Sequence, residues 1–367
     1  MAEPAAPPAR PLRLGLFMSL ALGHKTQFLN WQRVLAGYSA RVSPLFVPLP
    51  TTVDGTLLEK VPLVPELTRR KINDWFLIRG AVRKGALDAV LMNPYGLAVN
   101  HLGVLREHPT FLLLDATRRQ FEGLTGYYQA TTESGPFGAL RHRRQRAAIH
   151  GAAGLFPASE WAARSLVEDY GAAPEKVHVI PAGVDPTWFT PAPEKRPRDG
   201  KLRVLFVGGD FQRKGGDLLL RWAETTAQKD FEVHVVTGRA LPPAANVTQH
   251  AAANNSTTLL ELYQRSDLLV LPTRADCSPL VTMEAMACGL PVVATRVGGV
   301  SEVIAEGETG FVIPPGDFGA LAERLDACSR DRHKLADLGR AARQRVLTRY
   351  DLNVLIPLAL SIIERAR

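Results

Sequence analysis

The sequence is poor in cysteine and has no long apolar run. Its 3 cysteines, Cys277, Cys288 and Cys328, form no C-x-x-C pair among the 367 residues. Cysteines so few and so spaced give neither a disulfide framework nor a zinc site, and they favour a reducing compartment, the cytoplasm. No stretch reaches the roughly 18 to 20 apolar residues that a membrane-spanning helix requires. The most apolar stretch near the C-terminus, residues 354–363, is too short and contains Pro357.

Motifs for metal, triphosphate and dinucleotide binding are also missing. No D-x-D occurs, and no His/Cys/Asp cluster has ligand spacing, so neither a divalent metal nor another resident cofactor is implied. There is no G-x-x-x-x-G-K-[ST] loop. Neither half opens with G-x-G-x-x-G, which argues against a nicotinamide-dependent oxidoreductase despite the α/β pattern described below.

Positive charge is unevenly distributed. The formal net charge is +8, and the first 190 residues hold 21 Lys and Arg against 15 Asp and Glu. Two stretches, 69–84 and 141–146, concentrate the basic residues, and the first interleaves them with Trp75, Phe76, Leu77 and Ile78. We expect a helix that packs its apolar face inside and leaves its basic face solvated. The alternative is an interfacial helix at an anionic membrane, which would place the protein at the inner membrane face. No nucleic-acid-binding motif accompanies the charge.

Short apolar runs alternate with helical stretches in both halves, as in parallel sheets with crossover helices. The Leu12–Met18 run follows Arg10 and Arg13, and we interpret it as a first strand rather than a signal peptide. Further expected strands are Ala89–Met92, Phe111–Leu114, Gly154–Pro157, Val177–Ile180, Leu202–Val207, Glu232–Val236, Leu268–Leu271 and Pro291–Ala294. Expected helices are Asp217–Gln228, Thr257–Ser266, Val281–Cys288 and Leu352–Arg367.

This pattern predicts an α/β protein of two Rossmann-like, doubly wound domains that face each other across a cleft. The first domain would span residues 1–188, and the proline-rich segment 189–201 would be a linker. The second domain would span 202–350. A C-terminal helix, 351–367, would pack back toward the first domain.

A glycine-rich turn follows the strand Leu202–Val207. It reads Gly208-Gly209-Asp210-Phe211-Gln212-Arg213-Lys214-Gly215-Gly216 and leads into a helix. Glycines let backbone N–H groups approach an anion, while Arg213 and Lys214 supply full positive charges. The turn suits a diphosphate, although glycine turns with basic residues also occur for structural reasons alone.

The stretch from Pro272 to Ala294 places two carboxylates eight positions apart. Asp276 lies in the loop after a buried strand, and Glu284 lies in the first turns of the helix that Gly289 and Pro291 end. Carboxylates at this place can accept hydrogen bonds from ribose and hexose hydroxyls. Alternatively, Glu284 only stabilises a helix start and Asp276 lies in a solvated turn.

These residues resemble the retaining glycosyltransferases of family four, also called the glycosyltransferase group one domain, which have the GT-B fold. That family has a glutamate, seven residues, and a second glutamate that opens E-A-M-A-x-G-x-P-V-V. Here residues 284–293 match, as do Gly298, Gly299 and Glu302, while the first glutamate is replaced by Asp276. The turn at 206–215 resembles the family's phosphate loop, and residues 177–185 resemble its interdomain signature.

The resemblance implies roles for residues of the second half. Glu284 would bind the donor ribose, Arg213 and Lys214 the diphosphate, and Asp276 the transferred hexose. Gly208, Gly209, Ser278, Pro279, Leu280 and Val281 would complete the donor site. It further implies metal-independent transfer from a UDP- or GDP-linked sugar, with retained anomeric configuration, to a hydroxyl of a glycan, lipid-linked or small-molecule acceptor.

The first half resembles the family less closely. Gly23 and His24 occupy the place of its first glycine-rich loop, so His24 would donate a hydrogen bond or move a proton, unless it only packs locally. Asp115 replaces a histidine that contacts the sugar in many relatives, and a helix cap is its alternative role. Asn93, at the end of the expected strand Ala89–Met92, is a similar candidate for a sugar or acceptor contact, again with a structural role as the alternative. Ser159 would be structural or close to the donor, and Trp161 would lie in the core.

Two other functions are compatible with parts of the pattern. An epimerase or phosphorylase of the same two-domain plan would need catalytic groups that are not visible here. A degenerate protein that binds a nucleotide-sugar or glycan without turnover is compatible with the changes at Asp276 and Asp115.

Overall fold

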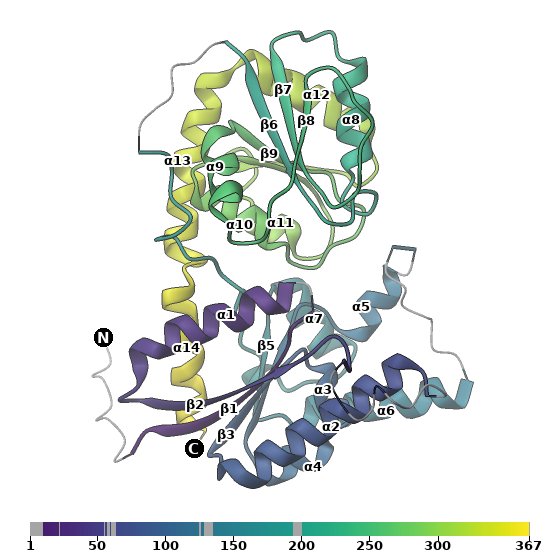
Figure 1. The fold of residues 1–367 in the computed structure, drawn as a ribbon, viewed down its shortest axis with the longest axis vertical. Helices are drawn as coiled ribbons and strands as arrows, with labels where there is room; N and C mark the ends of the chain where they lie inside the picture. The colour runs from purple at the N-terminus through teal and green to yellow at the C-terminus, as the bar shows by residue number, and fades with distance from the viewer. Residues whose placement is uncertain are drawn as a thin grey trace. The chain divides into compact units, whose positions relative to one another are not determined.

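The computed structural model describes residues 10–21, 23–54, 56, 59, 64–124, 126–127, 135–193 and 200–366, and they form two compact units (Figure 1). Unit 1 holds the described residues up to Gln120, those from 135 to 181, and the C-terminal segment from Asn353. Unit 2 holds Ala182–Leu352 and a short segment that begins at Phe121. Residues 194–199, inside the expected linker, lie outside the described residues.

Unit 1 is built on a sheet of five parallel strands in the order β2-β1-β3-β4-β5. The strands are β1 (Leu12–Ser19), β2 (Val42–Leu49), β3 (Ala89–Asn93), β4 (Thr110–Leu114) and β5 (Gly154–Pro157). The strand order reverses between β1 and β3. In such sheets the loops that leave the two strands at this point diverge, which opens a crevice at their carboxyl ends.

Helices cover both faces of this sheet, with α1 and α14 on one side and α2 and α4 on the other (Figure 1). The helices that lie wholly or partly in unit 1 are α1 (Gly23–Leu35), α2 (Glu66–Gly85), α3 (Gly96–Val99), α4 (Leu102–Glu107), α5 (Arg118–Gly123), α6 (Gly135–Gly151), α7 (Glu160–Glu168) and α14 (Leu352–Arg365). Two 3₁₀ turns are η1 (Ala36–Tyr38) and η3 (Pro174–Lys176). The last helix buries Leu360 and Ile363 completely, and its Glu364 pairs with Arg41 at 2.6 Å.

Unit 2 has a sheet of six parallel strands in the order β11-β10-β9-β6-β7-β8. The strands are β6 (Leu202–Val207), β7 (Phe231–Val236), β8 (Val247–His250), β9 (Leu268–Leu271), β10 (Val292–Thr295) and β11 (Gly310–Ile313). If β6 is counted as the first strand, the order is 6-5-4-1-2-3, which is the order of a Rossmann sheet. The strand order reverses between β6 and β9.

Helices α8 and α12 lie on one side of this sheet, and α9, α10 and α13 lie on the other (Figure 1). Their bounds are α8 (Gly216–Thr225), α9 (Thr257–Arg265), α10 (Leu280–Ala287), α11 (Val300–Val303), α12 (Phe318–Arg330) and α13 (Arg332–Arg349). Strands and helices together enclose a core in which β6, β9 and β10 are buried on both faces, as a central parallel strand requires.

The α/β class and the doubly wound sheets are confirmed, but one expected strand is wrong. Val177–Ile180 makes only an isolated bridge, Val177 to Leu155, with two further backbone bonds to β5. The partner strand is just four residues long and Pro181 follows at once, so no ladder continues. Strands β2, β8 and β11 were not expected. Strand β2 contains Pro44 and Pro48, which an edge strand tolerates because one side makes no ladder bonds.

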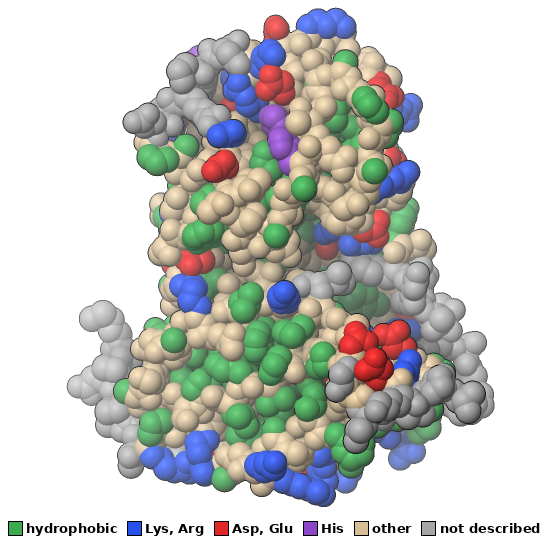
Figure 2. All heavy atoms as spheres, in the orientation of Figure 1, with side chains coloured by type: hydrophobic (Ala, Val, Ile, Leu, Met, Phe, Trp, Pro, Cys, Tyr) green, Lys and Arg blue, Asp and Glu red, His purple; other side chains and the backbone are tan. Residues whose placement is uncertain are grey.

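Helix α2 departs from the expectation for the basic stretch. Ile78 and Val82 are buried as expected, but Trp75 is 42% exposed and Phe76 is 62% exposed. The expectation that the apolar residues all pack inside is therefore wrong. Figure 2 shows the face of unit 1 that carries α2: hydrophobic side chains form a broad field with Lys and Arg along its lower edge. No helix of the described residues is long and apolar enough to cross a membrane.

Candidate functional site

The second-half site residues gather at the point where the order of the unit 2 sheet reverses. Strands β6 and β9 pair side by side, with Val204 opposite Leu268 and Leu205 opposite Leu269. The loop after β6 carries Arg213 and Lys214, and the loop after β9 carries Asp276. Both loops leave the carboxyl ends of adjacent parallel strands, where ligands of this fold class bind.

Glycine is required where the two loops meet. Gly215 has φ +79° and forms the N-cap of α8, and a Cβ built on it would lie 2.1 Å from the backbone oxygen of Pro272. The turn before it is tight, because Lys214 N–H donates to Asp210 O at 2.9 Å and Gly216 N–H donates to Phe211 O at 2.9 Å. Only a residue without a side chain allows this approach.

Two cations converge on one carboxylate at this meeting point. Lys214 Nζ forms an ion pair with Asp276 Oδ2, and Arg213 Nη1 lies 3.9 Å from the same oxygen. Arg213 Nη1 also donates to Ala275 O at 2.7 Å. All three side chains are largely buried, so their charges interact more strongly than they would in water. Arg213 Nε also lies 3.2 Å from the half-exposed carboxylate of Asp210, so two carboxylates balance the two cations beside the glycine turn and the start of α8.

A second ion pair fixes the two loops to each other. The guanidinium of Arg274 donates to both carboxylate oxygens of Asp217 on α8, at 2.6 and 2.7 Å. Its backbone N–H donates to Arg213 O at 2.8 Å. A two-point arginine–carboxylate contact fixes orientation as well as distance. The sequence did not predict this contact, although Arg274 lies within the stretch from Pro272 to Ala294 that carries the two carboxylates.

The glycine pair of the family motif packs directly on the loop that carries Asp276. Gly298 has φ +53°, and a Cβ on it would lie 2.2 Å from Asp276 O. Gly299 N–H donates to Cys277 O at 2.8 Å. The backbone of Asp276 is therefore held from both sides, while its Oδ1 accepts from Cys277 N–H at 3.0 Å.

Glu284 lies in the middle of α10 and is 6% exposed. The hydroxyl of Tyr263 on α9, itself fully buried, donates to Glu284 Oε2 at 2.8 Å. Burial raises the pKa of Glu284 from 4.5 to about 7, and the Tyr263 hydrogen bond opposes that rise. The role of Tyr263 was not predicted from the sequence, although a buried tyrosine generally needs a partner for its hydroxyl. Ser278 leads into α10, Pro279 is its N-cap, and Leu280 and Val281 are its first two residues.

The pKa of Glu284 predicts a pH dependence of stability. The folded protein holds this proton more tightly than the unfolded chain, so the contribution to stability is complete below pH 4.5 and is lost as pH rises through 7. We expect Glu284→Gln to remove this loss, which has a limiting slope of about 1.4 kcal/mol per pH unit. Urea unfolding between pH 4.5 and 8 measures it. Glu261→Gln, at an exposed helix position, is the control, and equal slopes in Glu284→Gln and wild type would contradict the prediction.

The first-half candidates lie at the corresponding reversal point of unit 1. Gly23 and His24 begin α1 directly after β1, and Asn93 ends the neighbouring strand β3. Asn93 Nδ2 donates to Gln27 Oε1 at 2.6 Å, which joins β3 to α1. Among the described residues, buried His24 Nδ1 makes no hydrogen bond. The structure thus brings Gly23, His24 and Asn93 to one edge of the sheet.

Asp115 follows β4, one strand further along the same edge. The helix after it, α5, is capped by another pair: Gln120 N–H donates to Thr117 Oγ1 at 3.3 Å, and Thr117 N–H donates to Gln120 Oε1 at 3.0 Å. Thr117 and Gln120 thus form a reciprocal capping box at the start of α5. Ser159 caps α7 by accepting from Ala162 N–H at 3.2 Å. Trp161 is only half-buried, so its expected core position is wrong.

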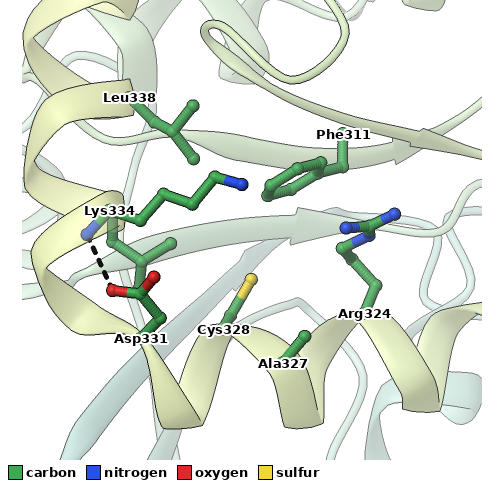
Figure 3. A pocket seen from close by; sticks show the side chains of 8 residues that line it. Phe311, Arg324, Ala327, Cys328, Asp331, Lys334 and Leu338 are labelled. Atoms are coloured by element: carbon green, nitrogen blue, oxygen red, sulfur yellow. Dashed lines mark hydrogen bonds between the residues drawn. The ribbon is translucent and has the colours of Figure 1, made fainter.

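A cavity of about 150 Å³ in unit 2 lies away from these residues (Figure 3). It is lined by Phe311 near the start of β11 and by residues from α12 and α13, so it lies toward the opposite end of the strands. Arg324 and Lys334 flank the ring of Phe311, with the guanidinium carbon of Arg324 4.1 Å from the ring centroid. In the described part of the chain, no group of three or more His, Cys, Asp or Glu side chains could hold a metal ion.

Two Rossmann-type sheets and a basic glycine turn at the reversal point of the second define the GT-B glycosyltransferase class. Comparison with protein families agrees: residues 201–331 match the model described as "Glycosyl transferases group 1", and residues 50–188 match "Glycosyltransferase Family 4". The two matched segments together span most of the chain. The chain belongs to this glycosyltransferase family.

Curated relatives share part of the sequence. The chain is 33% identical over 216 residues to a D-inositol 3-phosphate glycosyltransferase of Arthrobacter sp. (strain FB24), covering 53% of this chain and 51% of the relative. It is 34% identical over 211 residues to the protein of the same name from Thermomonospora curvata, covering 47% and 49%. The chain thus matches about half the length of these relatives.

Solved structures share the fold over nearly the whole chain. Sucrose-phosphate synthase from Thermosynechococcus elongatus has a TM-score of 0.79 at 17% identity, covering 96% of this chain and 98% of the other. HepE from Anabaena, in complex with UDP-glucose, has a TM-score of 0.71 at 18% identity, covering 97% and 99%. At such low identity the similarity shows the fold alone.

Proposed function

We propose that this protein is a retaining, metal-independent glycosyltransferase that moves a hexose from a UDP- or GDP-linked donor to a hydroxyl of a glycan, lipid-linked or small-molecule acceptor. The observation that carries the proposal is the convergence of Arg213 and Lys214 on Asp276 at the reversal point of the unit 2 sheet. Buried, preorganised cations stabilise charge that develops on a leaving diphosphate.

In the proposed reaction the bond between the sugar anomeric carbon and the diphosphate oxygen breaks, and the electron pair leaves with the diphosphate. Arg213, Lys214 and the N–H group of Gly209 stabilise that charge. Gly208, whose N–H donates to Val236 O at 2.9 Å, lets the diphosphate approach because it has no side chain. The acceptor hydroxyl bonds to the anomeric carbon from the same face and gives its proton to the departing phosphate. The protein supplies the cationic charge here, so the proposal needs no divalent metal.

Two carboxylates orient the donor in this proposal. Ionised Glu284 accepts hydrogen bonds from the ribose hydroxyls, and Asp276 accepts them from the hexose. Because Asp276 also pairs with Lys214, donor binding divides the two cations between this carboxylate and the diphosphate. Ser278, Pro279, Leu280 and Val281 set the position of α10 and so of Glu284.

The acceptor-side roles are assigned to unit 1. We assign His24 to hydrogen bonding or proton movement at the acceptor, and Asp115 to orienting the acceptor hydroxyl or a sugar hydroxyl. The buried Nδ1 of His24, which makes no hydrogen bond among the described residues, supports the first assignment. The position of Asp115 at the carboxyl end of β4, beside Asn93 at the end of β3, supports the second. A cytoplasmic location with contact at the inner membrane face fits the free thiols and helix α2.

The names of the relatives support the donor and acceptor classes. HepE was solved with UDP-glucose, and a further structure of it contains UDP and glucose. The curated relatives are named for an inositol phosphate, which is a small polyol with an anionic group. An anionic acceptor suits the excess of Lys and Arg in the first 190 residues.

The test is incubation with radiolabelled UDP- and GDP-hexoses and candidate acceptors. Release of labelled hexose or its appearance in a product supports the proposal, and proton NMR of the product reads the anomeric configuration. Inversion of that configuration would contradict a retaining reaction, and loss of transfer in EDTA would contradict metal independence. A thermal-shift screen over nucleotide-sugars selects the donor first, because a ligand that binds only the folded state raises Tm.

A second candidate is a degenerate member of the fold that binds a nucleotide-sugar or glycan without turnover. The ion pair between Lys214 and Asp276 favours it, since this pair neutralises the cation that the leaving group needs. Saturable binding of a labelled nucleotide-sugar with neither hydrolysis nor transfer would establish this candidate instead.

A further inference from the structure

The hydrogen bond from Tyr263 to Glu284 joins α9 to α10 inside unit 2. Tyr263 is fully buried and Glu284 is 6% exposed. The Tyr263 hydroxyl donates to Glu284 Oε2 at 2.8 Å. Among the described residues, nothing donates to Glu284 Oε1. The tyrosine therefore engages one oxygen of the carboxylate and leaves the other for a ligand.

The tyrosine is itself held in place by the segment that precedes the unit 2 sheet. Phe189 packs edge-on against the ring of Tyr263, with ring centroids 5.9 Å apart. The neighbouring Gln264 Nε2 donates to Thr190 O at 2.9 Å, which ties the end of α9 to the same segment. Because interiors are close-packed, a ring enclosed in this way keeps its hydroxyl directed at Glu284.

A guanidinium on α13 holds both α10 and the segment that packs on Tyr263. Helices α9, α10 and α13 lie on the same side of the sheet (Figure 1). Arg343 Nη1 donates to Ala287 O at the end of α10, at 2.5 Å, and to Phe189 O at 2.6 Å. One side chain thus fixes the helix that carries Glu284 relative to the ring that packs on its tyrosine partner.

Few titratable groups surround Glu284. From α10 itself there is Cys288, whose thiol is neutral because burial raises its pKa. Arg343 of α13 is occupied by carbonyl oxygens. Strands β9 and β10, which also pack on α10, carry no titratable side chain, and Glu302 of α11 does not shift the pKa of Glu284. Among the described residues, Tyr263 is therefore the group that stabilises this carboxylate.

Burial and the tyrosine act on the carboxyl in opposite directions. Burial raises the pKa of Glu284 from 4.5 to about 7, and the hydrogen bond from Tyr263 lowers it. Burial, and then the charge of Glu284, raises the pKa of Tyr263 well above its ordinary value, so its hydroxyl stays a donor at neutral pH. A hydrogen bond to the charged form favours that form. Loss of the hydroxyl would therefore move Glu284 further toward the neutral acid.

We propose that Tyr263 is a positioning residue of the donor site, whose hydroxyl holds the Glu284 carboxylate ionised and leaves Oε1 for the ribose hydroxyls. This inference rests on the proposed function, in which Glu284 accepts hydrogen bonds from the donor ribose. Tyr263 touches no substrate and acts only through Glu284. It lets a buried carboxyl act as an acceptor although its surroundings favour the neutral acid.

Binding of UDP and of GDP to Tyr263→Phe tests the proposal, because both nucleotides carry the ribose and the diphosphate whatever the hexose. The variant keeps the ring that packs on Phe189. We expect its Kd to exceed that of wild type by about 5-fold or more at pH 7, and the ratio to fall toward about 1 at pH 9, where the carboxyl is ionised in both proteins. The ratio of the two Kd values cancels titration of the nucleotide itself.

Calorimetry in buffers of different ionisation enthalpy counts the protons released on binding. At pH 7 the variant should release about 0.4 more protons per nucleotide than wild type, because more of its Glu284 starts as the neutral acid. Carbon-13 NMR of the free proteins should show that the pKa of the Glu284 carboxyl is higher in the variant. These two measurements report ionisation, which a loss of packing alone would leave unchanged.

Two controls separate positioning from a general effect on structure. Tyr350→Phe removes another buried tyrosine hydroxyl of unit 2, which donates to Glu302 O at 3.1 Å, and it should bind both nucleotides like wild type at each pH. The 2′,3′-dideoxy analogues of UDP and GDP lack the ribose hydroxyls. They should bind Tyr263→Phe and wild type about equally.

The outcomes distinguish this proposal from the proposed function. An unchanged Kd at every pH, a Kd ratio that stays the same from pH 7 to pH 9, or equal weakening of the dideoxy analogues would overturn the role of Tyr263 and leave the donor site in place. Binding of neither nucleotide by wild type would contradict the donor site itself, and this inference with it.

Discussion

Replacing Lys214 by alanine is expected to lower the rate of sugar transfer by at least about 100-fold, the scale for removing one preorganised group that stabilises developing charge. The side chain is 14% exposed and lies against Asp276, so no solvent cation takes its place. The same substitution leaves Asp276 facing only Arg213, at 3.9 Å, which weakens donor binding as well. Initial rates at saturating donor, with donor affinity measured separately by calorimetry, distinguish the two effects.

Lys229→Ala is the matched control for this substitution, because Lys229 is an exposed lysine in a loop of the same unit. It should transfer at the wild-type rate. Near-wild-type turnover by Lys214→Ala, with the variant shown to be folded, would remove Lys214 from the proposed donor site.

Glu284→Ala is expected to abolish transfer for a different reason, since it removes the proposed ribose contact.

Gly215→Ala is expected to lower the free energy of unfolding of unit 2 by about 3 kcal/mol or more. An L-residue at φ +79° costs about 1 to 2 kcal/mol, and the new Cβ would lie 2.1 Å from Pro272 O, so the loops after β6 and β9 must separate. Urea unfolding followed by tryptophan fluorescence measures the loss. Transfer activity should fall with it, because the separation moves Lys214 away from Asp276.

Gly238→Ala provides the comparison for Gly215→Ala. Gly238 lies in the loop after β7, has no heavy atom within 4 Å of a built Cβ, and does not have a positive φ. Its substitution should change stability by no more than about 0.5 kcal/mol. A loss of similar size in both variants would show that the contact with Pro272 does not restrict position 215.

The sequence predicted the central strands of both sheets, because these strands are short, apolar and buried. Leu202–Val207 and Leu268–Leu271 match β6 and β9 residue for residue. The edge strand β2 was missed because Pro44 and Pro48 interrupt the apolar pattern, and only pairing with β1 shows it to be a strand. Val177–Ile180 has the composition of a strand but lacks a partner long enough for a ladder.

The residues that carry the chemistry of the candidate site could be predicted from the sequence, but the contacts that hold them in place could not. The sequence singled out Arg213, Lys214 and Asp276, and the structure shows that their charges converge. Tyr263 is 21 residues from Glu284, and Arg274 is 57 residues from Asp217, so no local pattern connects these pairs. Such contacts depend on which strands are neighbours, and the sequence alone does not specify that order.

The exposure of Trp75 and Phe76 on α2 also follows from tertiary structure. A helical pattern with apolar residues on several sides predicts burial wherever a partner surface exists, and α2 has one, formed by β1 and β2. That surface covers only the line of Asp74, Ile78 and Val82. The remaining apolar side chains stay outside because no other element of the described chain covers them.

Helix α14 belongs to unit 1 although it follows the whole of unit 2 in the chain. During synthesis on the ribosome, residues 182–352 therefore emerge and can close their core before the first unit receives its last helix. Until then the surface of unit 1 that contacts Leu360 and Ile363 stays open to water and to chaperones. A released chain truncated before residue 353 would hold every residue of the second unit but would lack the last helix of the first.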